Sequence, residues 1–210
     1  MPRSMFFIAL LYGGMTVIAG VLGFKQVALG PLAVEAGIFA FLMLVVLSST
    51  TAQLYGDTMA NKLVLWGFVP LAMSALLVVI VLFLPPSDKM PGENIVAFNT
   101  VLSQTPRIMM AGPVAYGVSL FLNVWLFSKL RGSGDNDGTA SLMVRGAIAS
   151  ALSQAIDTLI FITLAFYGEF PIGSLLLGQM LAKVVLSLVL VPFLITGFVL
   201  FARWLDSKPV

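Results

Sequence analysis

Residues 142–167, LMVRGAIASALSQAIDTLIFITLAFY, form a long apolar segment with a charge near its centre, and the architecture can be inferred from it. A transmembrane helix needs about 20 mostly apolar residues, and this segment is longer than that. Asp157 nevertheless lies near its middle. A charge at the centre of a bilayer costs at least about 2.5 kcal/mol, so it is rarely kept without a partner or a function. The stretch therefore predicts a membrane-spanning helix whose carboxylate is either paired or functional.

The composition extends this interpretation to the whole chain. Of the 210 residues, 60% are hydrophobic and 10% are charged, and the mean hydropathy is +1.06, whereas soluble domains carry about 25% charged residues. We therefore predict an all-α integral membrane protein, a single bundle of six transmembrane helices that forms one domain over residues 1–210. The other five apolar stretches lie near residues 5–24, 33–55, 63–84, 107–127 and 174–200.

The basic residues predict the orientation of these spans. With six spans, both termini share one side with the loops after the second and fourth spans, and that side carries seven basic residues against three on the other. We therefore expect both termini to be cytoplasmic. The seven are Arg3, Lys62, Lys129, Arg131, Arg145, Arg203 and Lys208, and Arg145 is interpreted as a topology anchor at the start of its span.

The outer loop over residues 85–106 contains a short helical pattern. Ile95, Phe98 and Leu102 have i, i+3, i+7 spacing, which is typical of an amphipathic helix at a membrane surface. Such a helix could lie at the interface without a further role, or it could act as a lid over the outer mouth.

A polar stripe runs along the span that holds Asp157. Ser150, Gln154, Asp157 and Phe161 are separated by four, three and four residues, so they share one helical face. Thr158 adjoins this face. The midpoint of the span is near Gln154, so we expect the stripe to lie at the centre of the membrane rather than at its edge.

The last span carries a second intramembrane charge, Lys183. Asp157 and Lys183 both lie about 14 Å from the outer end of their spans at about 1.5 Å per residue, so antiparallel neighbours could pair them directly. A static ion pair that only locks two helices is one interpretation. The crowding of Ser150, Gln154 and Thr158 around the pair favours the other, a substrate path.

Three further polar residues lie outside the polar stripe. Arg107 follows Pro106 at the outer boundary, either as an interfacial arginine or as a group at the substrate entrance. Gln179 lies one turn before Lys183 and is expected to extend its polar network, whereas Glu35 is expected to be solvated.

No enzymatic constellation is recognisable in the sequence. The chain has no His and no Cys, its spans hold no paired carboxylates, and it contains neither a nucleophile elbow nor a phosphate-binding loop. We expect no catalytic residues, no metal and no cofactor. A net charge of +2 gives no indication of nucleic acid binding.

Several short motifs resemble those of one transporter family. They are Leu54-Tyr-Gly, Thr105-Pro-Arg, Ala115-Tyr, Phe127-Ser-Lys-Leu, Arg145, the Ser153-Gln-x-x-Asp-Thr block, Lys183 and Pro192. In their order, over about residues 30–200, the chain resembles the queuosine precursor transporter family, also called the vitamin uptake transporter family. It departs from the usual pattern at Ser49 and Gln53, where acids are typical, at Leu120 and Asn123, and in lacking a Tyr soon after Pro192.

The resemblance implies uptake of 7-deazaguanine-type bases, in cyano or aminomethyl form, across the inner membrane of a bacterial cell. The polar residues suit such a heterocyclic base. Asp157 would accept hydrogen bonds from the base edge, Gln154 would make a bidentate contact, and Lys183 would be a counter-charge or a donor to the carbonyl. Phe161, Phe166 or another aromatic would stack on the flat face, Ser150 and Thr158 would add polar contacts, and Arg107 would act at the entrance.

Two other functions remain open from the sequence. The chain could be the substrate-binding subunit of an energy-coupling-factor vitamin importer, which needs an ATPase module. It could also be a structural membrane protein whose ion pair only fixes packing. A stripe of small residues on the first helix could face the bundle, a second copy in a homodimer, or another subunit. It comprises Ala9, Gly13, Thr16, Gly20 and Gly23.

Overall fold

The computed structural model describes residues 2–23, 25–29, 32–103, 106–131, 138–168 and 172–207. Six of its helices are long and apolar enough to cross a membrane, so the predicted all-α architecture with six spans is confirmed. These helices are α1 (Arg3–Leu22), α2 (Gly37–Tyr55), α3 (Asp57–Phe83), α5 (Pro106–Lys129), α6 (Thr139–Phe166) and α7 (Gly173–Ser207).

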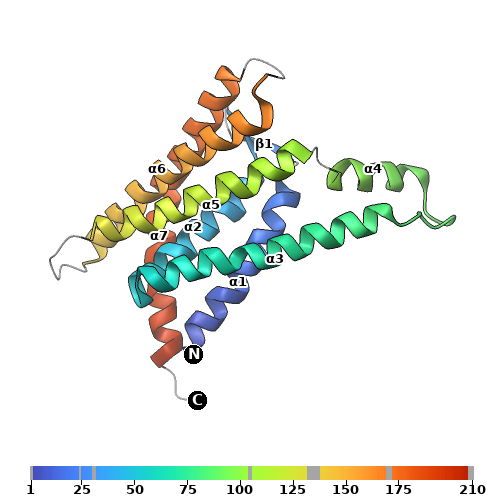
Figure 1. The fold of residues 1–210 in the computed structure, drawn as a ribbon. Helices are drawn as coiled ribbons and strands as arrows, with labels where there is room; N and C mark the ends of the chain where they lie inside the picture. Colours follow the sequence, from blue (N-terminus) through green and yellow to red (C-terminus); the bar gives the residue numbers. More distant parts are fainter. Residues whose placement is uncertain are drawn as a thin grey trace.

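The helices differ in how far they enter the bundle (Figure 1). In the most apolar 18-residue segment of each helix, 72% of the α2 residues are buried, against 11% of the α3 residues. A helix that is hydrophobic on all sides and buried lies in the core, and one with exposed apolar sides faces lipid in a membrane protein. α2 is thus the central element, and α3 lies at the periphery.

Both termini lie at the same end of the bundle (Figure 1), as an even number of spans requires. Ser4 and Tyr55 hold this end together through Asp206 near the end of α7. The backbone N–H of Ser4 donates to Asp206 Oδ1 at 2.9 Å, and the Tyr55 hydroxyl donates to Asp206 Oδ2 at 3.0 Å. These bonds tie α1, α2 and α7 together at the end of the bundle that we call the terminal end.

A short antiparallel hairpin stands at the opposite end, where the sequence predicted that the second span begins at residue 33. β1 (Gln26–Leu29) pairs with β2 (Leu32–Glu35), and α2 begins only at Gly37. The backbone N–H of Ala36 donates to the Lys25 carbonyl at 2.7 Å and closes the hairpin. The predicted start of the second span was wrong because hydropathy alone does not distinguish a short apolar strand from the first turns of the apolar helix that follows it.

Gly37 fixes the hairpin against α1. A Cβ added at Gly37 would lie 2.8 Å from the Ala19 carbonyl oxygen and 3.1 Å from Gly23 Cα. Only glycine allows the backbones to approach this closely. The junction between β2 and α2 therefore sits at a defined place against the end of α1.

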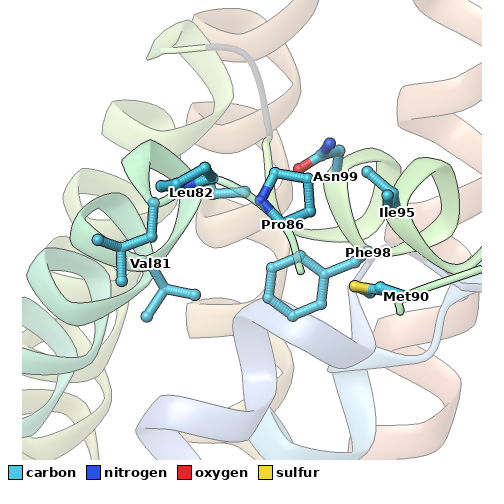
Figure 2. A pocket seen from close by; sticks show the side chains of 9 residues that line it. Val81, Leu82, Pro86, Met90, Ile95, Phe98 and Asn99 are labelled. Carbon is cyan, nitrogen blue, oxygen red and sulfur yellow. The ribbon is translucent and has the colours of Figure 1, made fainter. Parts of the chain in front are cut away.

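The amphipathic helix predicted in the outer loop is confirmed as α4 (Gly92–Leu102). It packs beside the end of α3, and a pocket of about 270 Å³ lies between them (Figure 2). Its apolar lining includes Val81, Ile95 and Phe98. None of the residues of α4 is buried. This position is beside α3 rather than over the polar residues of α6, so a role as a lid gains no support.

Candidate functional site

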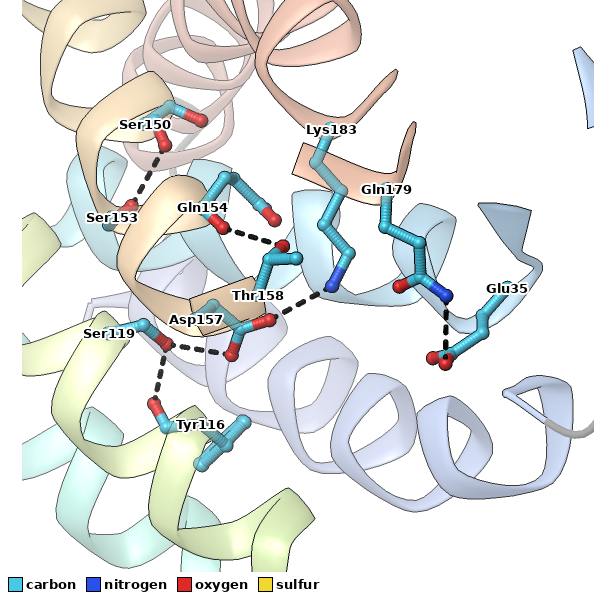
Figure 3. A network of polar contacts seen from close by, with 10 residues as sticks. All are labelled: Glu35, Tyr116, Ser119, Ser150, Ser153, Gln154, Asp157, Thr158, Gln179 and Lys183. Atoms are coloured by element: carbon cyan, nitrogen blue, oxygen red, sulfur yellow. Dashed lines mark hydrogen bonds and ion pairs between the residues drawn. The ribbon is translucent and has the colours of Figure 1, made fainter. Parts of the chain in front are cut away.

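The two intramembrane charges meet in the interior of the bundle, as the sequence predicted. Lys183 Nζ lies 3.1 Å from Asp157 Oδ2, and each of the two residues is 6% exposed (Figure 3). Asp157 belongs to α6 and Lys183 to α7, which pack as antiparallel neighbours. Matched depth on consecutive spans is sufficient to bring the charges together.

The second oxygen of Asp157 has a partner that the sequence did not reveal. The Ser119 hydroxyl of α5 lies 3.2 Å from Asp157 Oδ1 and 3.2 Å from the Tyr116 carbonyl oxygen. A hydroxyl has one hydrogen to donate, so these two bonds are alternatives. Ser119 can leave Asp157 without losing an acceptor, which frees Oδ1 for another donor.

Gln154, one turn before Asp157, is fully buried. Neither its amide nitrogen nor its amide oxygen has a hydrogen-bond partner among the described residues. The Ser150 hydroxyl, a further turn away, is in the same state. Buried polar groups are nearly always bonded, and an unmade bond costs about 1–3 kcal/mol. These groups form a set of donors and acceptors that is suited to a ligand.

The polar region continues from Lys183 to the hairpin. Gln179, one turn before Lys183, is 3% exposed and donates from Nε2 to Glu35 Oε1 at 3.3 Å (Figure 3). The predicted extension by Gln179 is thus present, whereas the expectation of a solvated Glu35 was wrong. Glu35 is half-buried because the hairpin turns it toward α7. We call Glu35, Ser119, Gln154, Asp157, Gln179 and Lys183 the ion-pair cluster.

Three other predicted site residues take more limited positions. The Thr158 hydroxyl donates to the Gln154 carbonyl at 3.0 Å, so its hydrogen is used within α6. Phe161 is half-buried one turn after Asp157, and its ring meets Phe166 edge-on with a centroid separation of 6.0 Å. Arg107 lies in the first turn of α5, and its side chain lies outside the described part of the structure.

A second polar cluster lies nearer the terminal end. Arg145, interpreted from sequence as a topology anchor at the start of its span, is 3% exposed, so its side chain lies within the bundle. Its Nη2 donates to Gln53 Oε1 at 2.8 Å, and its guanidinium lies 4.9 Å from the centre of the Phe127 ring. Its side chain enters the bundle because α2 and α5 supply an amide and an aromatic face there.

Asn123 joins the second cluster from α5. Its amide donates to Ser48 at 3.3 Å and to Ser49 at 3.0 Å. Together with Arg145, Gln53 and Phe127 these residues form what we call the arginine cluster. Three of the positions at which the chain departs from the resembled family pattern, Ser49, Gln53 and Asn123, therefore gather in one place.

The ion-pair cluster has the chemistry of a binding site for a small polar molecule. It offers anionic, cationic and neutral amide groups in a buried setting, and a ligand can exchange with its hydrogen bonds. The described residues contain no group of three or more acidic residues able to hold a metal ion. The two surface pockets described for the structure are lined by residues outside this cluster.

Comparison with known proteins gives two matches. The family described as "Putative vitamin uptake transporter" matches residues 35–197. A protein of Bacillus subtilis (strain 168) named "Probable queuosine precursor transporter" is 27% identical over 184 residues, which cover 86% of this chain and 79% of that protein. No solved structure matches. The family match begins at Glu35 and ends within α7, so it contains every residue of the ion-pair cluster.

Proposed function

The chain belongs to the vitamin uptake transporter family, and on that premise we propose that it imports a queuosine precursor, a 7-deazaguanine-type base, or a related small heterocycle. The name of the Bacillus subtilis relative supports this substrate class. We infer transport rather than catalysis, in the inner membrane of a bacterial cell. The matches name neither an ATPase module nor a subunit of an energy-coupling-factor importer, so they do not favour that alternative.

The observation that carries the proposal is that the buried amide of Gln154, one turn from the Asp157–Lys183 pair, has no hydrogen-bond partner among the described residues. Proteins read a base by hydrogen bonds along its edge and by stacking on its face. A guanine-like edge presents adjacent N–H donors and a carbonyl acceptor. Asp157 and the amide oxygen of Gln154 would accept from the donors, and Lys183 or the amide nitrogen would donate to the carbonyl.

Binding of the base requires two existing bonds to change. Ser119 would turn from Asp157 to the Tyr116 carbonyl, which already lies 3.2 Å away. Lys183 would exchange Asp157 for the ligand. Because the pair joins α6 to α7, loosening it on binding would change the preferred arrangement of these helices, as alternating access requires.

The proposal is tested by uptake of a labelled 7-deazaguanine into cells that cannot make the precursor and carry only this chain. We expect uptake above that of cells without the chain. Thr50→Val is a matched control. Thr50 lies outside the ion-pair cluster, and its buried hydroxyl has no partner among the described residues, so this variant should transport normally. Absence of uptake by a correctly inserted protein would contradict the proposal.

The orientation of the termini is part of the same proposal and rests on the seven-to-three distribution of basic residues. A reporter fused after Val210 should report the cytoplasm, and one inserted near Lys89 should report the outside. The opposite pattern would reverse the direction in which the ion-pair cluster is approached.

A further inference from the structure

Among the described residues of the hairpin, Glu35 is the one charged side chain that belongs to the ion-pair cluster. It is the last residue of β2 and lies opposite Gln26 in the hairpin register. The close contact of Gly37 with Ala19 fixes where β2 joins α2. The carboxylate therefore reaches α7 through the fold of the hairpin, and not by a free movement of a loop.

Glu35 is coupled to the ion pair through α7. Gln179 donates to its Oε1 at 3.3 Å, and Lys183 follows one turn later and bonds Asp157. Figure 3 shows the Lys183 ammonium on the side of Gln179 that faces Asp157, with Glu35 on the other side. The charges of both Lys183 and Asp157 act on Glu35.

The charges of the cluster do not balance. Asp157 and Glu35 contribute −1 each and Lys183 contributes +1, so the sum is −1 when both carboxyl groups are ionised. Burial raises the pKa of Glu35, and the positive charge of Lys183 and the hydrogen bond from Gln179 only partly oppose this effect. An uncompensated charge away from water is costly, and a cation placed beside it removes that cost.

The acceptors around Glu35 fit a protonated amine. Gln179 Oε1 is buried and has no partner among the described residues, and it belongs to the same amide that bonds Glu35. An ammonium group carries three donors and no acceptor. Glu35 and Gln179 together supply oxygen acceptors to such a group, and a neutral nitrile offers nothing to them.

We propose that Glu35, with Gln179, selects solutes in which the heterocyclic base carries a protonated amino group. The inference rests on the proposed function and deepens it, since Asp157 and Gln154 would hold the base edge while Glu35 accepts from the ammonium. The site thus discriminates by charge between an aminomethyl and a cyano form of the same base. Glu35 is a specificity-determining residue, and the hairpin is the element that places it.

The test compares uptake of labelled aminomethyl and cyano forms of 7-deazaguanine at neutral pH by the wild type and by Glu35→Gln. The glutamine keeps the size of the side chain and removes its charge. Loss of a hydrogen bond to a charged group should lower the ratio of aminomethyl to cyano uptake about tenfold or more. The ratio does not depend on the amount of protein in the membrane.

Glu93→Gln is the matched control, because Glu93 is an exposed carboxylate in the first turn of α4 and should leave the ratio unchanged. If Glu35→Gln does not reach the membrane, Gln179→Met, which removes the second acceptor, should lower the same ratio. An unchanged ratio, or an equal fall for both forms, overturns the inference alone. Uptake of neither form by the wild type overturns the proposed function and this inference with it.

Discussion

The ion-pair cluster and the arginine cluster are both buried and polar, but their polar groups have different kinds of partner. In the ion-pair cluster, opposite charges bond each other at 3.1 Å, and neighbouring amide atoms have no partner among the described residues. In the arginine cluster, Arg145 donates to a neutral amide and lies against an aromatic ring; the Asn123 amide nitrogen donates to two hydroxyl groups, and its oxygen has no partner among the described residues.

The two regions therefore give different expectations. Ser119 has an alternative acceptor in the Tyr116 carbonyl. Under the proposed function Asp157 and Lys183 would exchange their bond for a ligand, whereas the proposal leaves the bond between Gln53 and Arg145 in place. Changes in the ion-pair cluster should therefore reduce transport most, and changes in the arginine cluster should mainly reduce stability.

The largest effect is expected from Asp157→Asn, which should abolish or strongly reduce binding and uptake while the protein remains folded in the membrane. Asn cannot accept from two donors as an anion, and it leaves Lys183 buried without its counter-charge. Removing half of a buried pair typically costs about 3–5 kcal/mol, so thermal unfolding must be measured beside binding. Unchanged uptake with reduced stability would make the pair a structural element.

The double variant Asp157→Leu with Lys183→Leu separates the two roles of the pair. Replacing a buried pair with apolar residues is often neutral or stabilising, because no charge remains unpaired. The double variant should fold at least as well as either single variant and transport nothing. Uptake by the double variant would show that the pair is scaffolding and would move the binding site elsewhere.

Arg145→Met tests the other side of the comparison. The change removes the charge and leaves the buried acceptor of Gln53 without its donor, which should lower the free energy of unfolding by about 1–3 kcal/mol. Uptake per folded molecule should fall much less than for Asp157→Asn. If uptake is lost while stability is retained, the arginine cluster takes part in transport and the distinction fails.

Glu35→Gln should give the smallest effect on stability, and one that depends on pH. The pKa of Glu35 is raised above its ordinary value of 4.5, so the folded state prefers the protonated carboxyl. The resulting stabilisation is present at acidic pH and is lost as pH rises through the raised pKa. The charged groups that act on Glu35 are Lys183 of α7 and Asp157 of α6.

Without ligand, the variant should therefore match the wild type near pH 4 and melt about 1–3 °C higher near pH 8. Melting curves in detergent across this range measure the difference. A variant that melts lower than the wild type near pH 8 would show that Glu35 is stabilised in its ionised form, by Lys183 or by another cation.

Much of the fold could be predicted because each span is a local property of the chain. Twenty apolar residues in lipid have to form a helix, since only a helix satisfies all its backbone hydrogen bonds within one segment. The Asp157–Lys183 pair could also be predicted, because consecutive spans are antiparallel and the two charges have the same depth. The periodicity of residues 95–102 likewise predicted α4 correctly.

The amino-acid sequence is thus sufficient to predict the number of spans, their helical state, the placement of both termini at one end of the bundle, and one ion pair. The tertiary structure alone decided that Glu35 joins this pair, that Ser119 shares its carboxylate, and that Arg145 points into the bundle beside Gln53 and Phe127. Hydropathy and spacing fix the depth of a residue and its face on its own helix. They do not fix which residue of a distant helix or hairpin contacts that face. These tertiary contacts determine where the acceptors and charges of the proposed binding site lie.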